Sequence, residues 1–269
     1  MSFSIAGKTA IVTGAATGVG LAIARHFQER GANVVAADMD EARLNEALGA
    51  DASDDTNLRI FAGDLCQKLA IANLLSTAID AFERVDILVN ANRAVAVTDP
   101  IAGDDDTMEA MLRQNLLANL KMSQSVARRM IAQAEREGAE GAPAGSIVTV
   151  SSIASQRTRA ELLAYSVACA GLDQATRSLA LALAPHRVRV NGVAFGSVMS
   201  GHLQSVLKEH PDWRAEIAAG TPLGRIAAAT EVTEAVQYLA SDASGFVTGQ
   251  ILTVDGGRTL LDPVAVPAH

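Results

Sequence analysis

The 269-residue chain is poor in aromatic residues, in cysteine and in long apolar runs, and each shortage argues against a class of protein. Aromatic residues make up 3% of the sequence, which argues against an aromatic-rich binding surface, whereas 49% is hydrophobic and can fill a sizeable core. No apolar run reaches the roughly 18 residues that a transmembrane helix needs, so we expect no membrane partner. The opening stretch, MSFSIAGKTAIVTG, lacks a basic segment followed by an apolar one, and we do not expect a signal peptide.

Positive charge is also scarce in this sequence. The 22 Lys and Arg residues are outnumbered by 30 Asp and Glu, which gives a net charge of −8 and no basic stripe. We therefore expect no nucleic acid partner. The two cysteines, Cys66 and Cys169, are far apart and not at metal-ligand spacing, so we predict no metal site. A reduced, cytoplasmic protein is the simplest interpretation.

Short apolar runs alternate regularly with longer helical patterns along the chain. Such alternation is typical of a parallel sheet covered by helices on both faces, and near-continuous apolar runs are typical of its buried strands. We predict a single α/β domain over residues 1–269, with a Rossmann-type doubly wound parallel sheet of seven strands. The expected strands are 9–14, 32–38, 58–64, 85–90, 145–152, 187–193 and 251–256, and the expected helices are 18–30, 41–49, 67–82, 105–136, 164–184 and 230–241.

Two segments interrupt this alternation. Residues 135–145 are rich in Gly, Ala and Glu, and we expect a solvated loop there. Residues 197–224 lie between the sixth strand and the last helix, and a long excursion at that place predicts a lid over a ligand. Pro185 is expected to end the fifth helix.

A glycine-rich loop, TGAATGVG, joins the first strand to the first helix. Gly14, Gly18 and Gly20 would let the backbone turn sharply and approach a pyrophosphate at the helix N-terminus. A tight turn without a ligand also favours glycine, but a loop between a strand and a helix favours a nucleotide. At the end of the second strand, Asp38 could bond both hydroxyls of an adenosine ribose and repel a 2′-phosphate, which predicts NAD rather than NADP as the cofactor. The alternative is that Asp38 caps the helix that follows.

These residues and others further along resemble the short-chain dehydrogenase/reductase family over about residues 5–258. The resemblance is carried by Thr13 with the glycine loop, by Asp64-Leu65, by Gln114-Asn115-Leu116, by Ser152 thirteen residues before Tyr165, and by the stretches RVNGV and DASGFVTGQILTVDGG. It implies an NAD-dependent oxidoreductase that acts on a small alcohol or ketone, usually as a homotetramer. The cofactor residues that we predict are Thr13, Gly14, Gly18, Val19, Gly20, Asp38, Asp64, Leu65, Asn90 and Val198.

The same resemblance implies three catalytic residues. Tyr165 would exchange a proton with the substrate oxygen, Ser152 would hold that oxygen, and Asn115 would anchor a chain of water molecules. Ser152 could alternatively cap a helix. The family also has a lysine one helical turn after the tyrosine, which would lower the tyrosine pKa, because a nearby cation favours tyrosinate.

Here the sequence departs from the family, because Cys169 stands at the lysine position. A neutral thiol supplies no cation, and Cys169 is interpreted as a small buried apolar residue rather than a reactive thiol. Arg93 and the pair Phe195-Gly196 replace residues that the family places beside the nicotinamide. Arg93 could block that space, replace the missing cation, or turn outward to solvent.

The departures lie on the nicotinamide side and leave the adenosine side intact, which supports two hypotheses. The first is an NAD-dependent oxidoreductase with weakened or altered activity. The alternative is a catalytically inactive member of the family that binds a nucleotide or small ligand as a sensor or partner subunit.

Overall fold

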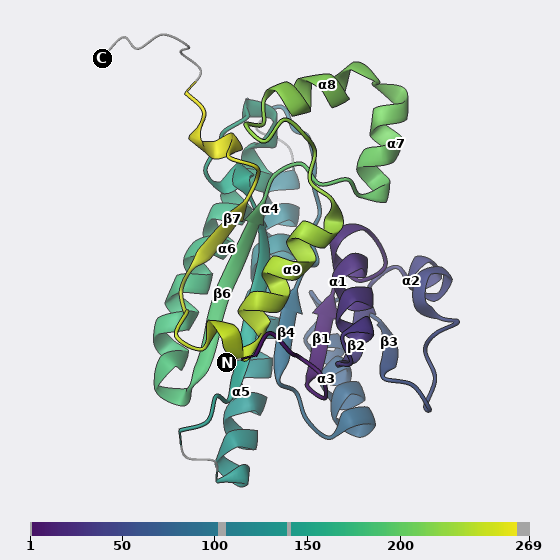
Figure 1. The fold of residues 1–269 in the computed structure, drawn as a ribbon, viewed down its shortest axis with the longest axis vertical. Helices are drawn as coiled ribbons and strands as arrows, with labels where there is room; N and C mark the ends of the chain where they lie inside the picture. Colours follow the sequence, from purple (N-terminus) through teal and green to yellow (C-terminus); the bar gives the residue numbers. More distant parts are fainter. Residues whose placement is uncertain (1, 102–105, 139–140, 263–269) are drawn as a thin grey trace.

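The structure, a computed structural model, describes residues 2–101, 106–138 and 141–262 (Figure 1). Seven parallel strands form one sheet in the order β3-β2-β1-β4-β5-β6-β7, which confirms the predicted doubly wound fold. The chain starts at β1 in the middle, winds outward to β3, then returns to β4 and winds outward to β7. The strands are β1 (Thr9–Thr13), β2 (Asn33–Asp38), β3 (Leu58–Ala62), β4 (Ile87–Asn90), β5 (Gly145–Ser152), β6 (Val188–Phe195) and β7 (Ile251–Val254).

Helices cover both faces of the sheet. One face packs on α1, α2 and α9 through side chains such as Phe27, Leu44 and Val236. The other packs on α3, α5 and α6 through side chains such as Leu74 and Met122. Since both faces are covered, β1 and β4 are buried along their whole length, which explains the apolar runs AIV and ILV within them. The helices are α1 (Gly18–Glu29), α2 (Glu41–Leu48), α3 (Lys68–Phe82), α4 (Thr107–Met111), α5 (Ala118–Glu137), α6 (Leu163–Leu183), α7 (Gly201–Glu209), α8 (Asp212–Ala219) and α9 (Ala229–Ala240).

The fourth predicted helix, 105–136, is not one regular helix. Its start at residue 105 lies outside the described residues, and between α4 and α5 the segment Leu112–Leu117 is π-helical. The wider turn rotates the residues that follow it, so a single 3.6-residue period does not run through the segment. Asn115 lies within this π-helical turn.

The predicted lid, 197–224, contains two helices that the sequence analysis did not anticipate, α7 and α8 (Figure 1). The Ser200 side chain caps α7 by accepting a hydrogen bond from Leu203 N. The fifth predicted helix ends as expected, because α6 stops at Leu183 and Pro185 lies in the short 3₁₀ turn that follows.

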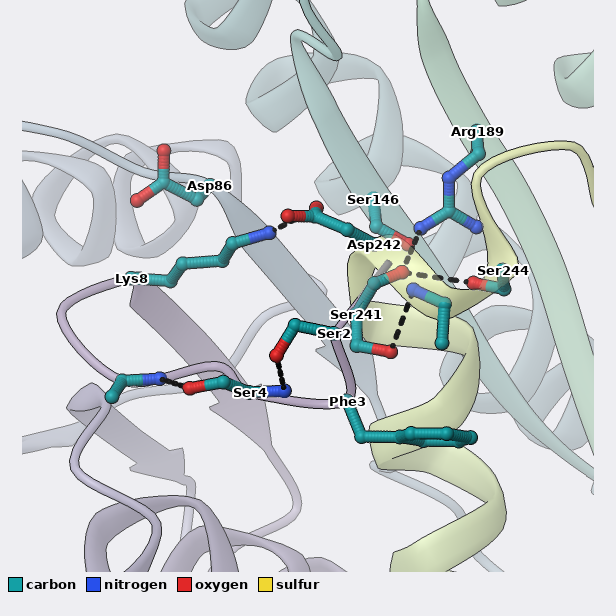
Figure 2. Close-up of polar contacts among 12 residues, drawn as sticks. Ser2, Phe3, Ser4, Lys8, Asp86, Ser146, Arg189, Ser241, Asp242 and Ser244 are labelled. Carbon is teal, nitrogen blue, oxygen red and sulfur yellow. Dashed lines mark hydrogen bonds and ion pairs between the residues drawn. The ribbon is translucent and has the colours of Figure 1, made fainter.

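The amino ends of the strands carry a cluster of charged side chains with structural partners (Figure 2). Arg189 of β6 donates to the carbonyl of Ser241, directly after α9, at 3.0 Å (Figure 2). It also donates to the carbonyl of Leu239, at the end of α9, at 2.9 Å. Lys8 Nζ lies 2.5 Å from Asp242 Oδ1 and joins the N-terminal segment to the same place. Arg189 therefore satisfies carbonyls that the helix itself leaves without donors.

Within the described ranges, none of the helices combines the length and the apolar character that crossing a bilayer requires.

Candidate active site

A cavity of about 570 Å³ opens at the opposite edge of the sheet, where the strands have their carboxyl ends. The ends of β2 and β6 and the segment after β4 contribute to its wall, together with α7. In open α/β sheets, ligands bind at this edge, at the place where the strand order reverses. Here the reversal falls between β1 and β4, beside the glycine loop.

The glycine loop is shaped for a close backbone approach. Gly14 has φ +67°, and a Cβ there would lie 2.6 Å from the carbonyl oxygen of Ala91. A Cβ on Gly20 would lie 2.0 Å from the carbonyl oxygen of Gly14. Helix α1 begins at Gly18 without a side-chain cap from Thr17 and without an acidic residue in its first turn. Its first N–H groups and positive dipole end therefore face the cavity and suit an anionic group.

Asp38, at the end of β2, lines the same cavity. Its carboxylate accepts hydrogen bonds from the backbone N–H of Ala16, at 3.0 Å, and of Asp40, also at 3.0 Å. The alternative role as a helix cap is wrong, because Asp40 caps α2 by accepting from Arg43 N. Asp38 instead braces the glycine loop and presents negative charge to the cavity.

Asp64 and Leu65 form the wall beyond β3. The backbone N–H of Cys66 donates to Asp64 Oδ1 at 2.8 Å, and this hydrogen bond is the main reason that the pKa of Asp64 lies below its ordinary value. Asp64 is therefore a fixed, ionised acceptor at this wall.

Tyr165 and Ser152 lie together beside the cavity, although neither is among the residues that line it. Tyr165 lies in the first turn of α6 and is only 4% exposed, while Ser152 ends β5. Burial raises the pKa of Tyr165 above its ordinary value, while the charge of Arg93 and a hydrogen bond with Ser152 act in the opposite direction. The Ser152 hydroxyl also accepts from Ala154 N at 3.2 Å, so the capping role holds as well.

Cys169 follows Tyr165 by one turn on α6 and is 4% exposed. Burial raises the pKa of its thiol to about 11. The thiol is therefore neutral at physiological pH, as expected for a small buried apolar residue and not for a reactive one.

Asn115 fixes the segment that follows β4. Its side-chain amide donates to the carbonyl oxygen of Ala94 at 2.8 Å and accepts from the N–H of Ala94 at 2.7 Å. Asn115 is buried, and both of its amide atoms are engaged with backbone. In this structure the residue thus holds a loop in place, a role different from the predicted anchoring of water molecules.

Arg93 lies between Asn92 and Ala94, on the segment that Asn115 holds, and lines the cavity. Its Nη1 donates to the Tyr165 hydroxyl at 3.1 Å, and its guanidinium carbon lies 4.5 Å from the centre of the Phe195 ring. The guanidinium group therefore turns inward, although the residue as a whole is exposed.

Comparison with known proteins agrees with this arrangement. A family model described as enoyl-(acyl carrier protein) reductase matches residues 14–259. The chain is 35% identical over 258 residues to L-xylulose reductase of Mesocricetus auratus, covering 96% of this chain and 98% of that protein. It is 32% identical over 260 residues to galactitol 2-dehydrogenase of Agrobacterium fabrum, covering 93% and 97%. The chain belongs to the short-chain dehydrogenase/reductase family.

Solved structures of other short-chain dehydrogenases are similar along the whole chain. A gluconate 5-dehydrogenase from Burkholderia cenocepacia, in complex with NADP and tartrate, matches with a TM-score of 0.85 at 27% identity and covers 97% of this chain and 98% of its own. A 7α-hydroxysteroid dehydrogenase, in complex with NADH and 7-oxo glycochenodeoxycholic acid, matches with a TM-score of 0.84 at 28% identity and covers 95% of both chains. Both kinds of nicotinamide cofactor thus occur among the neighbours.

The structure of this family member places most of the predicted cofactor residues around the cavity. The predicted residues that line it are Gly14, Gly18, Val19, Gly20, Asp38, Asp64, Leu65 and Val198. Thr13 and Asn90 are fully buried and are not among the lining residues. The Thr13 hydroxyl bonds to Asn92 Oδ1 at 2.7 Å, and Asn90 Nδ2 donates to Ser123 at 2.8 Å. These two side chains support the site from behind.

Several lining residues were missed by the sequence analysis. Thr17 lies within the glycine loop and could have been found there, and Met39 follows Asp38 directly. Leu203 lies on α7, within the segment that was predicted to be a lid. Leu203 thus brings the segment 197–224 to the cavity wall, and its role as a lid stays a prediction.

Proposed function

We propose that the protein is an oxidoreductase that interconverts a small secondary alcohol and its ketone, with NAD as the cofactor. The observation that carries the proposal is the contact of Arg93, which lines the cavity that begins at the glycine loop, with the Tyr165 hydroxyl, beside which Ser152 lies. A proton donor, a hydrogen-bonding hydroxyl and a cation are the groups that carbonyl reduction requires. The named relatives, L-xylulose reductase and galactitol 2-dehydrogenase, favour a polyol or ketose as the substrate class.

In the reducing direction, the ketone oxygen would accept a hydrogen bond from Ser152 and a proton from the Tyr165 hydroxyl. The nicotinamide, when bound, supplies the hydride to the carbonyl carbon, so that the C=O bond becomes an alcohol. Burial keeps Tyr165 protonated at neutral pH, because it raises the pKa of the phenol. The resting enzyme is therefore prepared to donate a proton.

The adenosine half of the cofactor fits the glycine loop and the carboxylates beside it. The uncapped N-terminus of α1 would receive the pyrophosphate, and glycine at positions 14 and 20 lets the loop fold tightly, because a Cβ at either position would clash with the backbone of Ala91 or of Gly14. Asp38 would accept from the ribose hydroxyls and repel a 2′-phosphate. This carboxylate supports NAD over NADP.

The second candidate is a catalytically inactive member of the family that binds a nucleotide or small ligand. It is favoured by one observation, namely that Tyr165 and Ser152 are not among the residues that line the cavity, whereas Arg93 is. In that case Arg93 covers Tyr165 permanently, and ligand binding would be followed by no turnover.

We further propose that the protein acts in the cytoplasm as a homotetramer on a small-molecule substrate. Both cysteines are free, which suits a reducing compartment. Exposed apolar side chains such as Phe246, just before the edge strand β7, support assembly with further copies of the chain.

The first experiment is a calorimetric titration of the purified protein with NAD⁺, NADH and NADPH. The proposal predicts NADH binding that exceeds NADPH binding, followed by turnover of at least one of L-xylulose, D-erythrulose or galactitol with the matching cofactor. Tyr165→Phe should then reduce kcat by about 10²–10⁴-fold. If NADH binds tightly and no ketose, polyol or other small secondary alcohol is turned over, the second candidate replaces the first.

A further inference from the structure

Arg93 is fixed both at its guanidinium group and at the backbone from which its side chain projects. At the guanidinium end, Nη1 donates to the Tyr165 hydroxyl at 3.1 Å, and the group lies on the Phe195 ring at 4.5 Å. Phe195 pairs with Ser152 in the register of β5 and β6, so the ring that supports the arginine stands beside the proposed substrate-binding hydroxyl. The guanidinium group thus packs on the Phe195 ring, next to the hydroxyls of Tyr165 and Ser152.

The backbone on either side of Arg93 is fixed by buried or half-buried amides. On one side, the Asn92 side chain accepts from Thr13 Oγ1 at 2.7 Å and donates to the carbonyl of Gln114 at 3.2 Å. On the other side, Asn115 pairs with both backbone groups of Ala94. These contacts join the segment after β4 to β1 and to the π-helical turn, so the direction in which Arg93 leaves the backbone is defined.

Other groups around Tyr165 do not supply positive charge. Cys169 is a neutral thiol whose proximity raises the pKa of Tyr165, and Ser152 is an uncharged hydroxyl. Among the described residues that influence the pKa of Tyr165, Arg93 is the single cation, and its effect is to lower that pKa. The charge that a lysine at position 169 would bring from α6 is instead brought by a loop from the other side of the tyrosine.

We propose that Arg93 is a positioning residue for catalysis, which orients the Tyr165 hydroxyl and supplies the cation that the resemblance expects one turn later, at position 169. The proposal deepens the proposed function and rests on it. A guanidinium donor to the phenol oxygen leaves the phenol hydrogen pointing elsewhere, toward the substrate oxygen. A cation at the same distance stabilises the tyrosinate that remains after the proton is given.

The test measures the ionisation of Tyr165 directly and requires no substrate. The chain contains two tyrosines, so Tyr238→Phe leaves Tyr165 alone. Tyr238 packs against Phe3, and the phenylalanine keeps that ring contact. In this background the protein is produced with fluorotyrosine, whose phenol ionises at lower pH than that of tyrosine, and the fluorine NMR shift is followed against pH while circular dichroism confirms the fold.

Four variants separate charge from packing. Arg93→Met and Arg93→Gln remove the charge, and Gln keeps a hydrogen-bond donor; both should move the ionisation midpoint of Tyr165 to higher pH. Arg93→Lys should stay near the parent value, and Cys169→Lys added to Arg93→Met should bring the midpoint back down. Arg128→Met, which removes an exposed arginine of α5, is the matched control and should change nothing.

An unchanged or lower midpoint in Arg93→Gln, in a folded protein, would overturn the proposal, because the charge would then have no effect on Tyr165. If Arg93→Met and Arg93→Gln fail to fold, Asn115→Ala decides, because it releases the segment that carries Arg93: a higher midpoint retains the proposal, and an unchanged midpoint overturns it. The proposed function is tested separately: a raised midpoint without turnover of any substrate by the parent would retain the Arg93–Tyr165 interaction and reject the enzymatic role.

Discussion

At the scale of single residues, the protonation state of Tyr165 decides whether ketone reduction or alcohol oxidation is the faster direction of the proposed reaction. Burial raises the pKa of this phenol, and the opposing effects of Arg93 and Ser152 do not cancel the increase. The protonated form, which is the proton donor for ketone reduction, therefore persists through neutral pH and into the alkaline range. The deprotonated form, which alcohol oxidation requires as a base, is scarce until the pH approaches the raised pKa.

We therefore predict opposite pH dependences for the two directions. The kcat for ketone reduction should stay level across neutral pH and fall only in the alkaline range, whereas the kcat for alcohol oxidation should increase with pH. Steady-state rates measured in both directions over the same buffers would check this. A reduction rate that falls between mildly acidic and neutral pH would contradict it, because Tyr165 would then be losing its proton too early.

Cofactor choice is a second property of a single residue. Asp38→Ser removes the carboxylate that would bond the ribose and repel a 2′-phosphate, so NADH binding should weaken about tenfold, equivalent to about 1.4 kcal/mol, while NADPH binding should strengthen. Calorimetry with both cofactors measures the two changes. Asp40→Ser is the matched control, because Asp40 caps α2 and is not among the lining residues. Equal effects of the two substitutions would argue against the ribose role of Asp38.

At the scale of elements, the π-helical turn Leu112–Leu117 connects helix geometry to the site. It places Asn115 where one amide satisfies both backbone groups of Ala94, next to Arg93. A regular helix with the same sequence would present this side chain at a different angle. The turn therefore links the stability of the α4–α5 region to the position of Arg93.

Asn115→Ala should consequently affect both stability and activity. It leaves the N–H and carbonyl of Ala94 without partners, which should lower the free energy of unfolding by about 1–3 kcal/mol in urea titrations. It should also reduce turnover, because the backbone that directs Arg93 toward Tyr165 is no longer held in place. Asn45→Ala, which removes an exposed side chain–backbone hydrogen bond on α2, should change stability by less than about 0.5 kcal/mol. Similar losses of unfolding free energy in the two variants would mean that the hydrogen bonds between Asn115 and Ala94 contribute little to stability.

At the scale of the whole molecule, exposed apolar side chains gather along one end of the sheet. β7 is an edge strand, and Leu252 lies on it. Phe246 is fully exposed just before β7, and Leu181, near the end of α6, is 80% exposed. Ala180 packs against Gly249, which brings the end of α6 close to this edge. An edge strand flanked by apolar side chains is suited to pairing with a second copy of the chain.

We predict that substitution at this edge reduces the oligomer to a smaller species. Light scattering coupled to size-exclusion chromatography should give a tetramer for the parent protein and a lower mass for the double variant Phe246→Ser, Leu181→Ser. Leu69→Ser is the control, because Leu69 is similarly exposed on α3, away from this edge, and its removal should leave the mass unchanged. A monomeric parent protein would reject the proposal.

The amino-acid sequence determined the features of this protein that depend on local patterns. Buried strands require continuous apolar runs, a glycine loop requires residues without side chains at close approaches, and the thirteen-residue spacing of Ser152 and Tyr165 places them at the end of β5 and the start of α6. From these local features the sheet, the family and most of the cavity-lining residues could be predicted without knowledge of contacts between distant parts of the chain.

Only the tertiary structure decided where Arg93 points, which residue caps α2, and how Asn115 is used. Arg93 lies outside regular structure, so its direction depends on the contacts of Asn92 and Ala94 with residues 13, 114 and 115, which are distant from it in the sequence. The residue that caps α2 depends on backbone angles, and the helix begins two residues later than a cap at Asp38 would require, so that Asp40 is the cap. The π-helical turn contacts α6 as well as its sequence neighbours α4 and α5, and no local period in the sequence predicts it.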